Sequence, residues 1–174
     1  MKAMRTRTVI LLSTFLLAAS GAPAQEPAGE TAPPAVTGPV LTHDDVRQFM
    51  AAYDSSFASR RPEAVMRFFA DRLAVAVRGK PSSGGEVTRF DRAAFEQVWR
   101  QILPQVDELE QQRSREIIRV LPGGQRAQHR SLLSQSMRNG AKVISGRSEE
   151  LVTIELVDGT PKIVTIQAVE LEDR

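Results

Sequence analysis

The stretch THDDVRQFMAAYDSSFASRRPEAVMRFFADRLAVAV, residues 42–77, changes its hydrophobic period along its length. In its first part apolar side chains recur at steps of three and four, which predicts an amphipathic helix ending near Ser59. Thr42 suits the N-cap of this helix. Pro62 suits the first position of a short second helix, and the apolar, valine-containing run at residues 73–77 predicts a first strand. The first helix buries Val46, Phe49, Met50, Tyr53 and Phe57.

A third helix follows a Pro-Ser-Ser-Gly-Gly loop at residues 81–85. Asp91 is expected to cap it, and Phe90 to pack on Phe95 as a hydrophobic staple. Pro104 should kink or restart the helix. Its expected buried side continues through Phe95, Val98, Trp99, Ile102, Val106 and Leu109.

The C-terminal half predicts four long strands joined by tight turns. Asn139-Gly140 and Asp158-Gly159 are strong hairpin signals, and Pro122 begins a third, Gly-containing turn. The expected strands lie near residues 112–121, 126–138, 142–157 and 162–171. They should form an antiparallel meander.

This order of elements predicts an α+β fold with three N-terminal helices packed on a curved, mostly antiparallel sheet. The helices must cover one face of the sheet to bury their apolar sides. The result is a cone with the helices on its concave side and a pocket between helices and sheet.

The N-terminus carries the features of a secretory signal peptide at residues 1–24. Three basic residues precede an apolar run at residues 9–19, and Ala22 and Ala24 offer a cleavage site. The alternative is a membrane anchor, but a spanning helix needs about 20 apolar residues. We expect a periplasmic protein without membrane insertion after cleavage, full secretion being the alternative. Residues 25–41 are Pro-rich and predict a disordered tether, and residues 42–174 form one domain.

Composition excludes several classes of function. After signal cleavage 20 basic and 21 acidic residues remain, so no nucleic-acid surface is expected. The chain has no Cys, which excludes disulfides and thiol chemistry. With two His and no acidic cluster, neither a zinc nor a calcium site is expected. No nucleotide-binding motif is present, and no cofactor is expected.

Four segments resemble the opening of the nuclear transport factor 2-like superfamily, including its SnoaL-like and ketosteroid-isomerase-like branches. They are YDSSF (53–57), RPEAVM (61–66), FFADR (68–72) and AV (74–75). The resemblance covers residues 42–171 and implies the cone fold, a cone-shaped, cystatin-like roll. In the isomerase branch a helical Tyr stabilises the oxyanion and a strand Asp moves the proton; these positions fall on Tyr53 and Val77. Because a Val cannot transfer a proton, isomerase chemistry is not expected.

Side chains expected to line the pocket are Tyr53, Phe57, Trp99, His129 and Leu133. Tyr53, His129 and Glu149 are weak catalytic candidates, because they could move a proton if they converge. Each also has a structural interpretation. Tyr53 and Trp99 can be core residues, His129 a hydrogen-bonded strand residue, and Glu149 a solvent-facing carboxylate.

Three functions remain open from the sequence. The missing base favours a module that binds a small apolar ligand or a protein. The alternatives are a SnoaL-like enzyme that catalyses proton transfer or hydrolysis on a small apolar substrate, and a structural subunit of an envelope assembly. Because such folds often pair through the outer face of the sheet, we also expect a homodimer.

Overall fold

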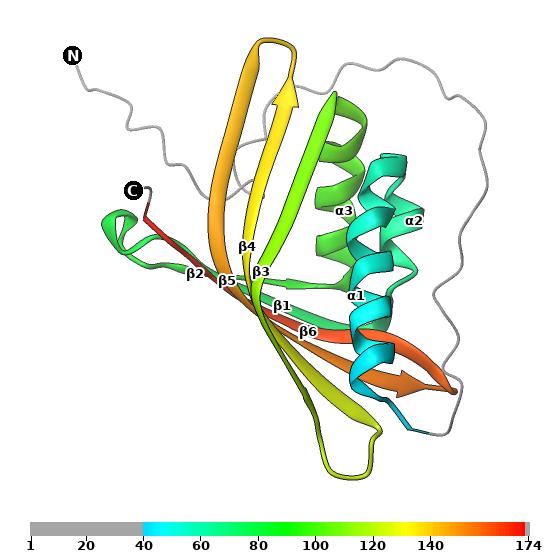
Figure 1. Ribbon diagram of the computed structural model, residues 1–174. Helices are drawn as coiled ribbons and strands as arrows, with labels where there is room; N and C mark the ends of the chain where they lie inside the picture. The colour runs from blue at the N-terminus through cyan, green and yellow to red at the C-terminus, as the bar shows by residue number, and fades with distance from the viewer. Residues whose placement is uncertain (1–39, 173–174) are drawn as a thin grey trace.

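The computed structural model describes residues 40–172, so the predicted signal peptide and nearly all of the predicted tether lie outside the described residues. Three helices cover one face of a six-stranded curved sheet (Figure 1). The helices are α1 (His43–Ser56), α2 (Pro62–Met66) and α3 (Arg92–Ile102). The strands are β1 (Phe69–Arg78), β2 (Val87–Asp91), β3 (Glu108–Val120), β4 (Arg126–Asn139), β5 (Lys142–Val157) and β6 (Thr160–Glu170). The predicted fold class is confirmed.

The ends of the helices follow the local signals in the sequence. The Thr42 hydroxyl accepts a hydrogen bond from the Asp45 backbone N–H at 3.1 Å, and the Asp45 carboxylate accepts one from the Thr42 N–H at 2.9 Å. This reciprocal capping box starts α1. Asp91 accepts from the Ala94 N–H at 2.8 Å and starts α3, while the rings of Phe90 and Phe95 lie 6.3 Å apart, as the predicted staple requires.

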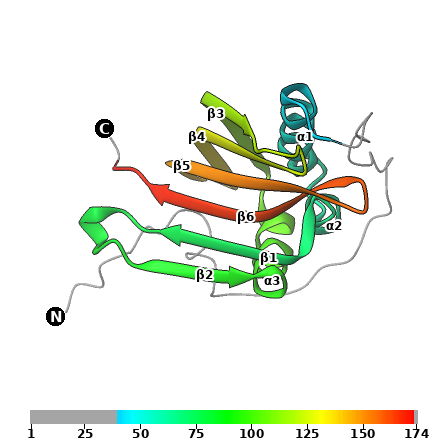
Figure 2. The same ribbon diagram turned by 90° about the horizontal axis from the view of Figure 1, so that it is seen from below.

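The strands are ordered β2-β1-β6-β5-β4-β3, with β1 and β6 parallel and all other pairs antiparallel (Figure 2). The predicted four-stranded meander is confirmed as β3 to β6. Two details were not predicted correctly. Strand β2 was missed, because its short edge sequence VTRFD shows no clear hydrophobic alternation. Val106 and Leu109 were expected on α3, but the chain leaves the helix after Ile102 through a 3₁₀ turn that contains Pro104.

A β-bulge in β3 changes which side chains face the helices. Ser114 pairs with Leu132 and Ile117 with Arg130, so Arg115 and Glu116 together oppose one residue of β4. Arg115 takes a left-handed φ of 53° at this point. The extra residue reverses the alternation of the strand. Glu116 therefore faces the helices, on the same side of the sheet that odd-numbered residues occupy before the bulge.

Aromatic rings fill the space between helices and sheet. Tyr53 meets Phe57, Phe68 and Phe69 edge-on, with ring centroids 5.2, 5.7 and 5.5 Å apart. Phe57 in turn meets Trp99 at 5.0 Å. Such edge-to-face pairs stabilise a core beyond the burial of area alone. Within residues 40–172 no helix has the length and hydropathy needed to cross a membrane.

Candidate functional site

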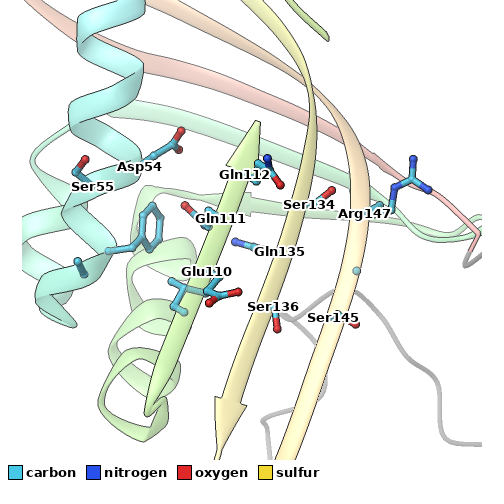
Figure 3. A pocket seen from close by; sticks show the side chains of 14 residues that line it. Asp54, Ser55, Glu110, Gln111, Gln112, Ser134, Gln135, Ser136, Ser145 and Arg147 are labelled. Atoms are coloured by element: carbon cyan, nitrogen blue, oxygen red, sulfur yellow. The ribbon is translucent and has the colours of Figure 1, made fainter. Parts of the chain in front are cut away.

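A groove and an inner cavity adjoin each other between α1 and the sheet. The groove has a volume of about 990 Å³ and lies between the C-terminal part of α1 and strands β3 to β5 (Figure 3). The inner cavity has a volume of about 50 Å³. Phe57, Gln111 and Gln135 belong to the walls of both. The two spaces therefore form a funnel that narrows towards the core.

The wide part of the funnel is polar. Gln111 on β3 and Gln135 on β4 are directly paired across the two strands, and their amides lie close together in Figure 3. Ser134, Ser136 and Ser145 also border the groove, but they alternate with Gln135 and Gly146 along β4 and β5, so their side chains belong to the outer face of the sheet. The Gln111 and Gln135 amides offer both donors and acceptors to a ligand.

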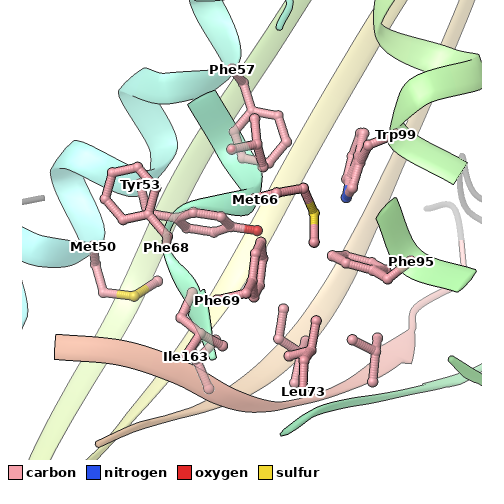
Figure 4. Close-up of a cluster of buried hydrophobic side chains, with 14 of the residues drawn as sticks. Met50, Tyr53, Phe57, Met66, Phe68, Phe69, Leu73, Phe95, Trp99 and Ile163 are labelled. Atoms are coloured by element: carbon pink, nitrogen blue, oxygen red, sulfur yellow. The ribbon is translucent and has the colours of Figure 1, made fainter. Parts of the chain in front are cut away.

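The narrow part of the funnel is aromatic. Tyr53 and Phe57 from the first helical segment meet Phe95 and Trp99 from α3 around the inner cavity. Figure 4 shows the Tyr53 hydroxyl and the Trp99 indole nitrogen directed towards the space between these helices. Trp99 is only 4% exposed, and among residues 40–172 its Nε1 has no hydrogen-bond partner. The cavity thus combines apolar walls with a few polar atoms.

One arginine organises the charges at the base of the funnel. The Arg113 side chain is 5% exposed, and its Nε lies 2.8 Å from an Asp54 carboxylate oxygen. Its Nη1 donates to Glu150 at 2.8 Å and to the Ser131 hydroxyl at 2.9 Å. Arg113 therefore joins α1 to β3, β4 and β5, and we call Asp54, Arg113 and Glu150 the ion triad.

Burial sets the protonation of the groups around the ion triad. It raises the pKa of Tyr53, with a further increase from the charge of Glu150, so the phenol stays protonated and can donate a hydrogen bond. Burial is also the main cause of the raised pKa of Asp54, which Arg113 opposes. For Arg113, burial lowers the pKa, but the negative charges of Glu150 and Asp54 raise it by a larger amount. The pKa of Arg113 is therefore raised overall, and the guanidinium stays charged.

The structure brings some of the predicted site residues together and separates others. Tyr53, Phe57, Trp99 and Leu133 line the inner cavity. His129 is fully buried on the same face of the sheet but does not line that cavity; its Nε2 lies 2.8 Å from Glu116. Glu149 is exposed and accepts a hydrogen bond from Arg130 at 2.9 Å. It lies on the opposite face of the sheet from its neighbour Glu150, so Tyr53, His129 and Glu149 do not converge.

Sequence reasoning missed Asp54, Arg113 and Gln111 as site residues. Polar residues flank Arg113 on β3, so no hydrophobic period marks its inward face. The one local signal for Asp54 as a site residue was its position directly after Tyr53 in the sequence. No group of three or more His, Cys, Asp or Glu residues in the described part of the chain could hold a metal ion.

Comparisons with known proteins identify the fold. No protein-family model matches the chain, and no curated protein matches its sequence. A nuclear transport factor 2-like protein with a cystatin-like fold from Novosphingobium aromaticivorans superposes with a TM-score of 0.55 at 16% identity, over 75% of this chain and 82% of that one. A candidate scytalone dehydratase from the same organism gives 0.59 at 16% identity, over 72% and 80%.

A third similar structure is a candidate calcium/calmodulin-dependent protein kinase II association domain from Xanthomonas campestris. It superposes with a TM-score of 0.61 at 14% identity, over 84% of this chain and 99% of that one. The chain therefore has the nuclear transport factor 2-like fold, which confirms the resemblance. Another similar structure, a nuclear transport factor 2-like protein from Pseudomonas putida, is of unknown function, and the likeness defines a fold and not an activity.

Proposed function

We propose that the chain is a binding module that takes one end of a small, largely apolar ligand into the aromatic part of the funnel. The observation that carries this proposal is the ion triad. Both carboxylates that reach the base of the funnel are paired with Arg113, and His129 is paired with Glu116 outside the cavity. A general base must be free to take a proton from the substrate, so the pairing favours binding over proton transfer.

The ring-lined cavity also suits such a ligand energetically. Ligand sites are mostly concave and apolar, with a few well-placed polar groups. The aromatic ring of a ligand would contact Tyr53, Phe57 and Trp99, while its remainder would lie in the polar groove.

Trp99 is the only tryptophan of the chain and lies in the wall of the cavity, so its emission reports on this site alone. We expect toluene or phenol to change the Trp99 emission in a saturable way and to raise the melting temperature. Ala168 also lines the cavity, so Ala168→Leu should abolish both effects. Ala93→Leu, on the exposed side of α3, is the matched control and should leave them unchanged. If neither compound binds the unsubstituted protein, the proposal fails.

We also propose that two copies pair through the outer face of the sheet. Ile117 and Val169 are 62% and 41% exposed there, beside a hollow of about 460 Å³. Arg119 lines this hollow and makes no ion pair with any described residue, while Glu149 lies in the same hollow. In a pair related by a two-fold axis through the hollow, each copy would present Arg119, Glu149 and the exposed apolar residues to the same surface of the other copy. Light scattering should show a dimer that Ile117→Asp converts to a monomer; a monomeric unsubstituted protein would contradict the pairing.

Export of the chain to the periplasm is the third part of the proposal. It is supported by the basic, apolar and small-residue pattern of residues 1–24. A module with its funnel open to the periplasm would meet ligands that enter from outside the cell.

A further inference from the structure

Two buried polar atoms in the wall of the funnel lack partners. They are Nε1 of Trp99 and Oε1 of Gln111, and neither forms a hydrogen bond within residues 40–172. Both residues line the inner cavity. Buried polar groups without partners are costly and rare in native proteins. Two of them at one cavity therefore indicate that something else completes their hydrogen bonds.

We infer that the ligand presents a neutral hydroxyl group to Trp99 and Gln111. This inference rests on the binding function proposed above and adds the chemical class of the ligand. An indole N–H can only donate a hydrogen bond, and an amide oxygen can only accept one. A hydroxyl group is the smallest group that both accepts and donates, so its chemistry matches both atoms.

Charged groups satisfy only one of the two atoms. A carboxylate has acceptors alone and would leave Gln111 without a partner, while an ammonium group has donors alone and would leave Trp99 without one. The ion triad argues against an anion as well, because Asp54 and Glu150 together outweigh the single positive charge of Arg113. The smallest uncharged ligand class that matches both atoms is therefore an alcohol or phenol with an apolar body.

Four single-ring compounds test this inference by calorimetry on the intact mature protein: phenol, toluene, benzoate and benzylamine. Phenol and toluene have similar shapes and differ in the hydroxyl group. A site built to hydrogen-bond a hydroxyl discriminates strongly against an analogue that lacks it. We expect phenol to bind about 10-fold or more tightly than toluene, and benzoate and benzylamine to bind more weakly than phenol.

Gln111→Met removes the acceptor and should reduce the affinity for phenol to near that for toluene. Gln128→Met makes the same chemical change at the outer face of the sheet and should leave the preference for phenol intact. Equal affinities for phenol and toluene, or an unchanged preference in Gln111→Met, would overturn the inference while the binding function stands. Failure of all four compounds to bind would instead overturn the proposed function, and the inference with it.

Discussion

The Asp54 carboxylate on α1 lies 2.8 Å from the Nε atom of Arg113 on β3, 59 residues further along the chain. No other ion pair in the described part of the chain joins the first helix to the sheet. Because the Arg113 side chain is almost completely buried, its charge depends on its two partners for compensation. The position of α1 over the funnel is therefore linked to the compensation of the Arg113 charge by Asp54 and Glu150.

Replacing Arg113 should destabilise the fold strongly. Arg113→Met leaves Asp54 and Glu150 without their counter-ion, and breaking a buried pair from one side costs about 3–5 kcal/mol. Urea denaturation should show a decrease of this size in the free energy of unfolding. Arg78→Met changes an exposed residue of β1 outside the hollow of the proposed dimer face and should stay within about 0.5 kcal/mol. Equal effects of the two substitutions would show that the triad contributes nothing to stability.

Asp54 should make stability depend on pH in the opposite direction from most carboxylates. Burial raises its pKa above the ordinary value of 3.8. Between that value and its higher folded-state pKa, the folded protein holds a proton that the unfolded chain has lost. The free energy of unfolding contributed by Asp54 therefore falls as pH rises through this window.

Urea unfolding of the unsubstituted protein and of Asp54→Asn, over about pH 3.5 to 6, measures this contribution as a difference. The stability of the unsubstituted protein relative to Asp54→Asn should decrease with rising pH. Asp44→Asn removes an exposed carboxylate from the same helix and serves as the control. A difference that grows with pH would mean that Arg113 lowers the pKa of Asp54 more than burial raises it.

The outline of the fold could be predicted because its signals are local. The Thr42 capping box, the Phe90 staple and the turns at Gly140 and Gly159 each act within a few residues. Strand β2 lacked such a local signal. It forms by pairing with β1, and the hydrophobic pattern of its own five residues does not indicate a strand.

The site was harder to predict because it depends on distant contacts and on one bulge. Tyr53, Phe57, Trp99 and Leu133 could be placed from their apolar faces. Arg113 could not, because its three partners come from three other elements. Glu149 was chosen over Glu150 without knowledge of the strand register. Because neighbouring side chains in a strand point to opposite faces of the sheet, an error of one residue selects the wrong face.

Strand β3 should tolerate glycine in place of Arg115, at the bulge, better than glycine at a regular position of the strand. Arg115 has a φ of 53°, which costs a residue with a Cβ atom about 1–2 kcal/mol and costs glycine little. Because glycine also loses more entropy on folding, Arg115→Gly should be neutral or stabilising by up to about 1 kcal/mol. Gln112→Gly, at a regular exposed position of the same strand, should destabilise by about 0.5–1 kcal/mol. If Arg115→Gly lowered the free energy of unfolding as much as Gln112→Gly does, the left-handed backbone at Arg115 would not be strained.

Export can be tested by the mass of the mature chain. Expressed in full in a Gram-negative host, the protein should appear in the periplasmic fraction with Gln25 as its first residue. Ala24→Phe places a large side chain at the cleavage site and should leave the precursor uncleaved. Ala28→Phe, four residues further on, should not affect processing. A chain that keeps Met1 and stays in the cytoplasm would refute export.

The last prediction concerns the point where the chain enters the domain. Leu41 donates its backbone N–H to the Gly124 carbonyl at 2.7 Å, so this entry point is fixed to the β3–β4 turn. A Cβ atom at Gly124 would lie 2.5 Å from the Val40 Cβ, whereas one at Gly123 would meet nothing within 4 Å. Both glycines have positive φ values, 85° at Gly123 and 66° at Gly124.

Alanine at either position therefore carries the same left-handed backbone cost of about 1–2 kcal/mol, and only Gly124→Ala adds a clash. We expect Gly124→Ala to lower the free energy of unfolding more than Gly123→Ala does. Val40→Gly should relieve the difference in the double variant, which makes the comparison a double-mutant cycle. If the cycle shows no coupling between positions 40 and 124, the entry segment is not held against the turn in solution.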